Sequence, residues 1–315
     1  MPIIVDHGCG YDPIFNGEKA LAYLRRICFV SEDLGAGLNP YTLKGSALRR
    51  YLRLSRNRAI IVSKAFMENG WTVEARPFEY KGHDAVNVIA YHGDGIEPGA
   101  VLIIAHHDYC AGVGAEDDGT ALGVMLELAA HVVDYRNVVF ASCDLEECGA
   151  IGSETLAREL EESLQLEFKA VIALECLGSG KDVVISSRMD GVDSDRDLMY
   201  DILCEAPFGS GISFMDFDCF YSDHVPFARR GCKTAQMCSL DKANKVPASE
   251  MDAQREEVAR GGRRKDGSVA HTCFDKPGEI KVENLELVGQ TLLNYIRRHA
   301  GVRPSLLRTS TEKNR

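Results

Sequence analysis

Apolar side chains recur three and four positions apart in six stretches of the chain. This spacing places them on one face of a helix, so each stretch predicts an amphipathic helix. The second stretch ends at Gly70, a residue type that tolerates the positive φ found just beyond many helix ends. The predicted helices cover residues 17–31, 47–69, 119–133, 154–164, 195–206 and 282–299.

Between these helices lie shorter runs that are apolar throughout or alternate between apolar and polar residues, as β-strands do. The first two runs surround Lys81 and Gly82 and predict a hairpin. Later runs, such as VLIIA at 101–105, are continuous and separated by helices, which indicates a mostly parallel sheet covered on both faces. The predicted strands cover residues 73–80, 85–92, 100–105, 137–144, 170–174, 183–187 and 233–238.

We therefore expect a single α/β domain over residues 1–300, with helices on both faces of one mixed, mostly parallel sheet. Residues 241–270 are polar and contain the basic cluster RGGRRKDG, so they predict a long surface loop. A contact with an acidic substrate group or with a neighbouring subunit is the alternative role for this cluster. Residues 301–315 predict a flexible C-terminal tail.

Composition narrows the class of protein. The 315 residues include 36 Lys and Arg against 47 Asp and Glu, for a net charge of −11, which argues against nucleic acid or an anionic membrane surface as a partner. No apolar run reaches the roughly 18 residues of a membrane span, and residues 1–13 have no signal-peptide pattern. Eleven scattered cysteines fit reduced thiols. We expect a cytoplasmic enzyme, either monomeric or a homo-oligomer.

Potential metal ligands follow three of the apolar runs. Each has an ordinary structural explanation when taken alone, such as a buried histidine, a helix N-cap or a solvated acidic pair. The carboxyl ends of parallel strands meet at one edge of a sheet, however, and carboxylates buried together there need a cation. The candidates are His106-His107-Asp108, Asp117-Asp118, Glu146-Glu147, Glu175 and His271.

This donor set consists of carboxylates and imidazoles, without a thiolate. Such ligands suit zinc, or another first-row divalent ion, in a catalytic role. There are enough of them for two ions about 3.5–4 Å apart, with one carboxylate left to carry protons.

The same segments resemble the motifs of the M28 family of zinc aminopeptidases, in the order found in that family. The similarity extends from about residue 17 to 299. The matching segments are HHD at 106–108, GAEDDGT at 114–120, FASCDLEECGAIGS at 140–153, LECLG at 174–178, SDHVPF at 222–227 and HTCFD at 271–275.

The resemblance implies an α/β/α sandwich of the zinc-aminopeptidase type and an enzyme that removes N-terminal residues from peptides. It implies two Zn²⁺ ions per chain, bridged by Asp117. His106 and Glu175 would complete the site of one ion, and Glu147 and His271 that of the other.

The resemblance also gives roles to residues beside the ligands. Glu146 would be the general base that takes a proton from the attacking water and passes it to the leaving amine, and Asp108 would hold the His106 ring. Some relatives carry a carbonyl-stabilising tyrosine immediately before the last histidine, but this chain has Ala270 there. Tyr221 and His224, in and beside the SDH segment, are the remaining candidates for contacting the substrate or its oxyanion.

Three alternatives stay open. The segments MLELA at 125–129 and DHVPFARRG at 223–231 also resemble glutaminyl-peptide cyclases, which bind one zinc ion. Cyclase pockets are rich in tryptophan, whereas the only tryptophan of this chain is Trp71. The substrate could instead be a non-peptide N-acyl or amide metabolite. A non-catalytic binding module is disfavoured because every implied ligand and the base are present.

Overall fold

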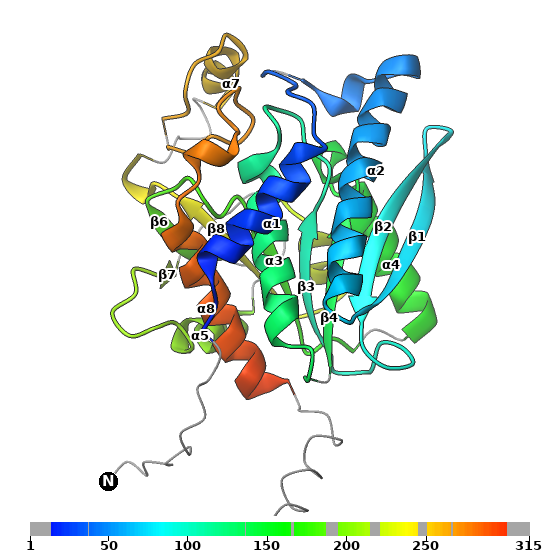
Figure 1. Ribbon diagram of the computed structural model, residues 1–315, viewed down its shortest axis with the longest axis vertical. Coiled ribbons are helices and arrows are strands. Elements are labelled where there is room, and N and C mark those ends of the chain that lie inside the picture. Colours follow the sequence, from blue (N-terminus) through cyan, green and yellow to red (C-terminus); the bar gives the residue numbers. More distant parts are fainter. Residues whose placement is uncertain are drawn as a thin grey trace, which may run out of the picture.

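The computed structural model describes residues 14–36, 38–135, 137–164, 167–186, 195–214, 221–244, 251–265 and 267–300. Its centre is one eight-stranded sheet with the order β1-β2-β4-β3-β5-β8-β6-β7 (Figure 1). The strands are β1 (Thr72–Tyr80), β2 (His83–Tyr91), β3 (Val101–His106), β4 (Val138–Cys143), β5 (Ala170–Glu175), β6 (Asp182–Ser186), β7 (Ser213–Phe214) and β8 (Thr234–Leu240).

Four central strands, β4, β3, β5 and β8, are parallel to one another. The hairpin β1–β2 joins one side of them antiparallel through β2 and β4, and β6 joins the other side antiparallel to β8. The predicted mixed, mostly parallel sheet is therefore confirmed. The carboxyl ends of β3, β4 and β5 lie at one edge of this sheet.

Helices cover both faces of the sheet. Because successive strand residues point to opposite faces, β3 sends Ile103 into the core beneath the α1 and α3 side and Leu102 into the core beneath α4. Figure 1 shows α1, α3 and α8 in front of the sheet and α4 behind it. The helices are α1 (Gly17–Phe29), α2 (Gly45–Glu68), α3 (Thr120–His131), α4 (Ile151–Leu164), α5 (Arg196–Cys204), α6 (Val225–Ala228), α7 (Met251–Ala259) and α8 (Val282–His299).

The six helices and seven strands expected from the sequence are all present, with ends that differ by at most three residues. The β1–β2 hairpin turns at Lys81 and Gly82, which both have positive φ, as a two-residue turn between twisted strands requires. The short elements β7 and α6 were not predicted, because two and four residues are too few to show a period.

The expectation of a continuous loop over residues 241–270 is wrong for residues 251–259, which form α7. This helix has no apolar stripe, since Gln254 and Val258 are its buried residues among those described, and so its sequence gives no helical periodicity. It ends before Gly261, whose φ is +89°. Residues 245–250, residue 266 and the expected tail at 301–315 lie outside the described residues.

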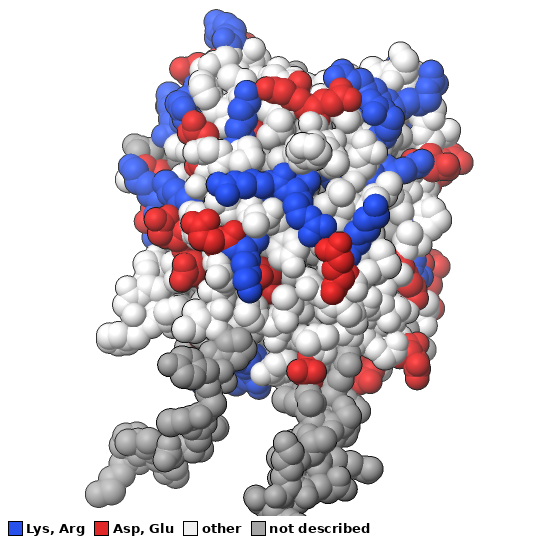
Figure 2. Space-filling model, viewed as in Figure 1, with Lys and Arg blue, Asp and Glu red and all other residues white. Residues whose placement is uncertain are grey.

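Charged residues of both signs are intermixed on the face formed by α1, α2 and α8 (Figure 2). Ion pairs connect several elements there, including Arg26 of α1 with Glu68 of α2 at 3.1 Å. Among the described residues, no helix is long and apolar enough to cross a membrane.

Candidate metal centre

The site lies at the carboxyl edge of the parallel strands. His106 is the last residue of β3 and pairs with Cys143, the last residue of β4. Glu175 is the last residue of the neighbouring strand β5. The strands β3, β4 and β5 are fully buried, which fixes the main chain that leads to the site. The side chains at the strand ends therefore have little freedom to move apart.

The loop between β3 and α3 carries Asp117 and Asp118, which are joined by a cis peptide bond. The Asp118 carboxylate accepts hydrogen bonds from the main-chain N–H groups of His106 at 3.4 Å and Cys176 at 3.2 Å. The Asp275 carboxylate accepts from the Asp117 N–H at 3.4 Å. These contacts hold the loop against the ends of β3 and β5 and leave the Asp117 carboxylate directed into the site.

His106, Asp117 and Glu175 form the first set of potential ligands, here called the buried group. His106 Nε2 lies 3.1 Å from Asp117 Oδ1 and 3.5 Å from Glu175 Oε1. All three residues are at most 6% exposed. Ser222 donates a hydrogen bond to the other Glu175 oxygen at 2.6 Å, which fixes the orientation of that carboxylate.

Cys110, Glu147 and His271 form a second set, here called the exposed group. The His271 Nε2 atom lies 3.1 Å from Glu147 Oε2 and 3.0 Å from Asp117 Oδ2. The two oxygens of Asp117 therefore face different groups. The His271 side chain is 52% exposed, so this group is open to solvent.

The unsatisfied atoms of both groups fit a metal ion. Among the described residues, His106 Nε2, Asp117 Oδ1 and Glu147 Oε1 are buried atoms without a hydrogen-bond partner. Within that same part of the chain, no Lys or Arg is ion-paired with Asp117, Glu147 or Glu175. Unpaired buried carboxylates are costly, and nitrogen, oxygen and sulfur donors at such spacing suit zinc.

Asp108 connects the two groups. One of its oxygens lies 3.3 Å from His106 Nδ1 and accepts the Glu146 N–H at 3.1 Å. The other accepts the Glu147 N–H at 3.1 Å and the buried Tyr51 hydroxyl at 2.7 Å. A single carboxylate thus sets both the His106 ring and the main chain that carries the two glutamates.

Glu146 and Glu147 do not end a strand, because β4 already ends at Cys143. They begin a 3-10 turn, Glu146–Cys148, that follows Leu145 in the left-handed region at φ 59°. The turn separates the two side chains, and Glu146 belongs to neither ligand group. Burial raises the pKa of the Glu146 carboxyl, and the negative charges of Glu175 and other nearby carboxylates act in the same direction.

The two candidates for substrate contact are in different environments. Tyr221 is 39% exposed, and its hydroxyl accepts a hydrogen bond from Arg229 at 3.3 Å. His224 is only 2% exposed, and burial lowers its pKa to about 4, so its ring is neutral near pH 7. The structure therefore brings His224 into the interior and not to the open side of the site.

Sequence reasoning missed three residues at the site. Cys110 joins the exposed group, although a thiolate was not expected. Tyr41 places its hydroxyl 2.9 Å from where a Cβ on Gly149 would be, next to the turn that carries the glutamates. Asp223 is buried, which raises its pKa to about 7. The SDH motif contained Asp223 but gave it no role, and no pattern marked the other two.

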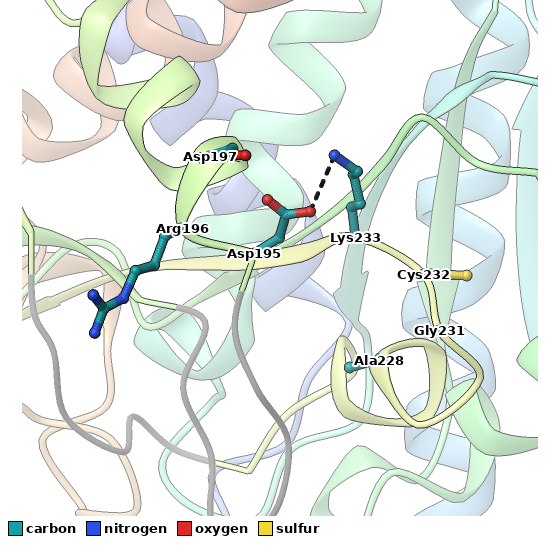
Figure 3. Close-up of a pocket in the computed structure, with 7 residues that line it drawn as sticks. All are labelled: Asp195, Arg196, Asp197, Ala228, Gly231, Cys232 and Lys233. Atoms are coloured by element: carbon teal, nitrogen blue, oxygen red, sulfur yellow. Dashed lines mark ion pairs between the residues drawn. The ribbon is translucent and has the colours of Figure 1, made fainter.

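A surface pocket of about 440 Å³ lies elsewhere. Asp195 and Lys233 line it and form an ion pair at 3.3 Å (Figure 3). Lys233 immediately precedes β8, and Cys238, near the other end of β8, pairs with Glu175. The pocket is therefore at the opposite edge of the sheet from the two ligand groups.

Comparison with known proteins agrees with the motifs. The sequence profile of peptidase family M28 matches residues 87–296, two thirds of the chain. The chain belongs to peptidase family M28. No curated protein sequence matches this M28 chain significantly.

Solved structures share the fold of this M28 chain. BSAP, a zinc aminopeptidase from Bacillus subtilis, has a TM-score of 0.72 and 13% identity over 93% of this chain and 97% of its own. The Legionella pneumophila LapA aminopeptidase has a TM-score of 0.66 and 16% identity over 92% of this chain and 72% of its own. The Porphyromonas gingivalis glutaminyl cyclase has a TM-score of 0.67 and 19% identity over 90% of this chain and 98% of its own. The same fold therefore serves both activities.

Proposed function

We propose that this M28 protein is a zinc-dependent aminopeptidase that holds two ions. The observation that carries the proposal is the orientation of Asp117, which presents Oδ1 to His106 at 3.1 Å and Oδ2 to His271 at 3.0 Å. A carboxylate shared in this way between two groups of donors is suited to bridge two ions.

In this proposal His106, Asp117 and Glu175 hold one ion, and Asp117, Glu147 and His271 hold the other. Bound zinc supplies Lewis acidity, which polarises an amide carbonyl and makes a water molecule more acidic. Asp108 keeps the His106 ring in place, and Ser222 keeps Glu175 in place, so that the ligands need no rearrangement before an ion binds.

Glu146 is the carboxylate that remains for proton transfer. Its main chain is held by Asp108, and its side chain stands outside both ligand groups. It accepts the proton of the attacking water and returns it to the nitrogen of the departing amine. The surplus of carboxylates at this edge also suits the positive charge of a peptide N-terminus.

A glutaminyl cyclase is the second candidate. The favouring observation is that a solved cyclase aligns with this chain as well as LapA does, with TM-scores of 0.67 and 0.66. The position of Trp71 argues against a cyclase, because cyclase pockets are rich in tryptophan and this only tryptophan of the chain lies away from the site. It is 4% exposed, donates to the main-chain oxygen of Ala129 at 3.0 Å and lies next to Thr72, which pairs with Tyr91 at the end of β2 remote from the site.

Metal content and substrate choice test the proposal together. Protein loaded with zinc and freed of loosely held metal is measured for ions per chain, and is then given aminoacyl anilides, N-acyl amino acids and peptides with N-terminal glutamine. We expect two ions and release of the aniline. One ion together with cyclisation of glutamine would establish the cyclase, and cleavage of N-acyl amino acids alone would establish a non-peptide substrate. A protein that holds no metal would overturn the proposal.

A further inference from the structure

The thiol of Cys110 stands among the ligand atoms of the exposed group. Its Sγ, a carboxylate oxygen of Glu147 and a ring nitrogen of His271 all lie within 4.8 Å of one another. Cys110 is 5% exposed and forms no disulfide in the structure. Of the described cysteines, it is the one that belongs to a potential metal-binding group.

The main chain around Cys110 is fixed at several points. Gly112 exchanges two hydrogen bonds of 2.8 Å with the segment at Leu34 and Gly35. The Val113 N–H donates to the main-chain oxygen of Asp275 at 2.9 Å. Asp275 lies four residues after His271, so the loop that carries the thiol is attached directly to the segment that carries the imidazole.

Gly112 makes this attachment possible. A Cβ at this position would lie 2.3 Å from the Asp275 main-chain oxygen, and the residue has a φ of +50°. Any larger residue would push the two segments apart. The position of the thiol relative to His271 is therefore a consequence of close main-chain packing and not of a flexible side chain alone.

An unsatisfied ligand atom marks the same place. Glu147 Oε1 is buried and has no hydrogen-bond partner among the described residues, while Oε2 lies 3.1 Å from His271. The thiol, the carboxylate and the imidazole each offer a ligand atom within 4.8 Å of the other two. Zinc is borderline-soft and accepts sulfur, nitrogen and oxygen donors in one site.

We propose that Cys110 is a thiolate ligand of the ion that Glu147 and His271 hold. The inference rests on the metal site of the proposed function and adds a ligand to one of its two positions. When the S–metal bond forms, the thiol releases its proton to solvent. With Asp117 Oδ2, this position then has four protein ligands, the number of a closed site, whereas the buried group supplies three and leaves a coordination position open.

The four-ligand position should therefore hold its ion more tightly, and the three-ligand position should be where substrate and water enter. This division makes the two ions unequal. It predicts that the ion of the exposed group is the last to leave during chelation, although its histidine is the more accessible one.

Cobalt(II) substitution tests the ligand directly, without an activity assay. A thiolate bound to cobalt(II) gives a charge-transfer band in the near ultraviolet, which nitrogen and oxygen ligands do not give. We expect the band in the wild-type protein and its loss in Cys110→Ser. The matched control is Cys148→Ser, because Cys148 is also buried beside Glu147 but packs in an apolar cluster with Leu48 and Leu145. Cys148→Ser should keep the band.

Affinity and X-ray absorption give two further readouts. Loss of a ligand's hydrogen-bond partner weakens metal binding by roughly 10–100-fold. Cys110→Ser removes a ligand itself, so the affinity for the ion of the exposed group should fall by at least as much. If this variant does not fold, absorption spectra of zinc-loaded wild-type protein decide, since a sulfur neighbour at about 2.3 Å is expected. Two bound ions without sulfur, or a band that survives in Cys110→Ser, would overturn the role of Cys110 alone. Failure to bind metal would overturn the proposed function as well.

Discussion

The buried group and the exposed group differ in how the chain assembles them. The buried group takes His106 and Glu175 from the last positions of two neighbouring parallel strands, and each residue is at most 6% exposed. The exposed group takes Cys110 from a loop, Glu147 from a 3-10 turn and His271 from the segment that returns after α7. Its histidine is half exposed.

This difference separates two tasks. A group at strand ends has its geometry set by the sheet, so it can stay precise while surrounding loops vary. A group built from loops depends on contacts between loops, such as those between Gly112 and Asp275. With the four protein ligands proposed above it would form the closed position, and the three-ligand buried group would keep a coordination position for substrate and water. Asp117, a member of the buried group, also reaches the exposed group, because Oδ1 faces His106 and Oδ2 faces His271.

Removal of Asp117 should have the largest effect, since it breaks both groups at once. Asp117→Ala should release both ions and reduce turnover to background. Elemental analysis per chain and an anilide assay measure the two outcomes. The control is Asp197→Asn, an exposed carboxylate that lines the remote pocket, which should keep both ions. A full metal complement in Asp117→Ala would refute the bridging role.

Thermal unfolding gives a second check on Asp117. Because bound ions stabilise the folded state, a chelator should lower the unfolding midpoint of the wild-type protein. The midpoint of Asp117→Ala should not respond to chelator, and should respond if the variant still holds an ion.

Substitution of Glu146 should have the next largest effect and should leave both groups intact. Glu146→Gln removes the proton carrier, for which a loss of about 10²- to 10⁴-fold in kcat is expected, with unchanged metal content. Glu147→Gln is the contrasting variant, because it should lose the ion of the exposed group. If Glu146→Gln loses metal and Glu147→Gln keeps it, the base and the ligand have been exchanged in our assignment.

Sequence patterns predicted the two groups to different extents. Continuous apolar runs located β3 and β5, so the neighbouring positions of His106 and Glu175 followed from the rule that parallel strands end at one edge. His271 was found from its motif, because a long segment whose course has no simple period separates it from β8. Cys110 carried no signal at all, since a cysteine in a loop becomes a ligand only when tertiary packing brings it to others.

The same limit applies to the fold. The hairpin and the six longer helices were predictable because each has a clear period or a turn signal. Helix α7 was missed because its few apolar residues form no stripe along one face. The relation of Glu146 to Glu147 depended on the left-handed Leu145, a main-chain conformation that leucine rarely adopts and that no pattern announces.

Residues that hydrogen-bond to the ligands, or to Asp108, should affect metal affinity less than the ligands themselves, and should distinguish the two groups. Ser222→Ala removes the hydrogen bond to Glu175, so about tenfold weaker binding is expected for the ion of the buried group alone. Tyr51→Phe removes a hydrogen bond to Asp108, which contacts both groups, so both ions should bind roughly 10–100-fold more weakly. Stepwise chelator titration measures each ion. If both variants weakened the same single ion to the same extent, the separation into two groups would be contradicted.

Substitution of Tyr41, which lies next to the turn that carries the two glutamates, should have the smallest effect on activity. Tyr41 contributes a hydroxyl beside Gly149, and its pKa is raised by burial and by the charge of Glu146, so it stays a hydrogen-bond donor above neutral pH. If it donates to the bound substrate, Tyr41→Phe should lower kcat/KM by roughly five- to tenfold, the equivalent of about 1–1.4 kcal/mol, without changing metal content. Tyr221→Phe is the matched variant. Its hydroxyl is held beside Arg229 at 3.3 Å, so a smaller loss is expected, and the reverse order would assign the substrate contact to Tyr221 instead.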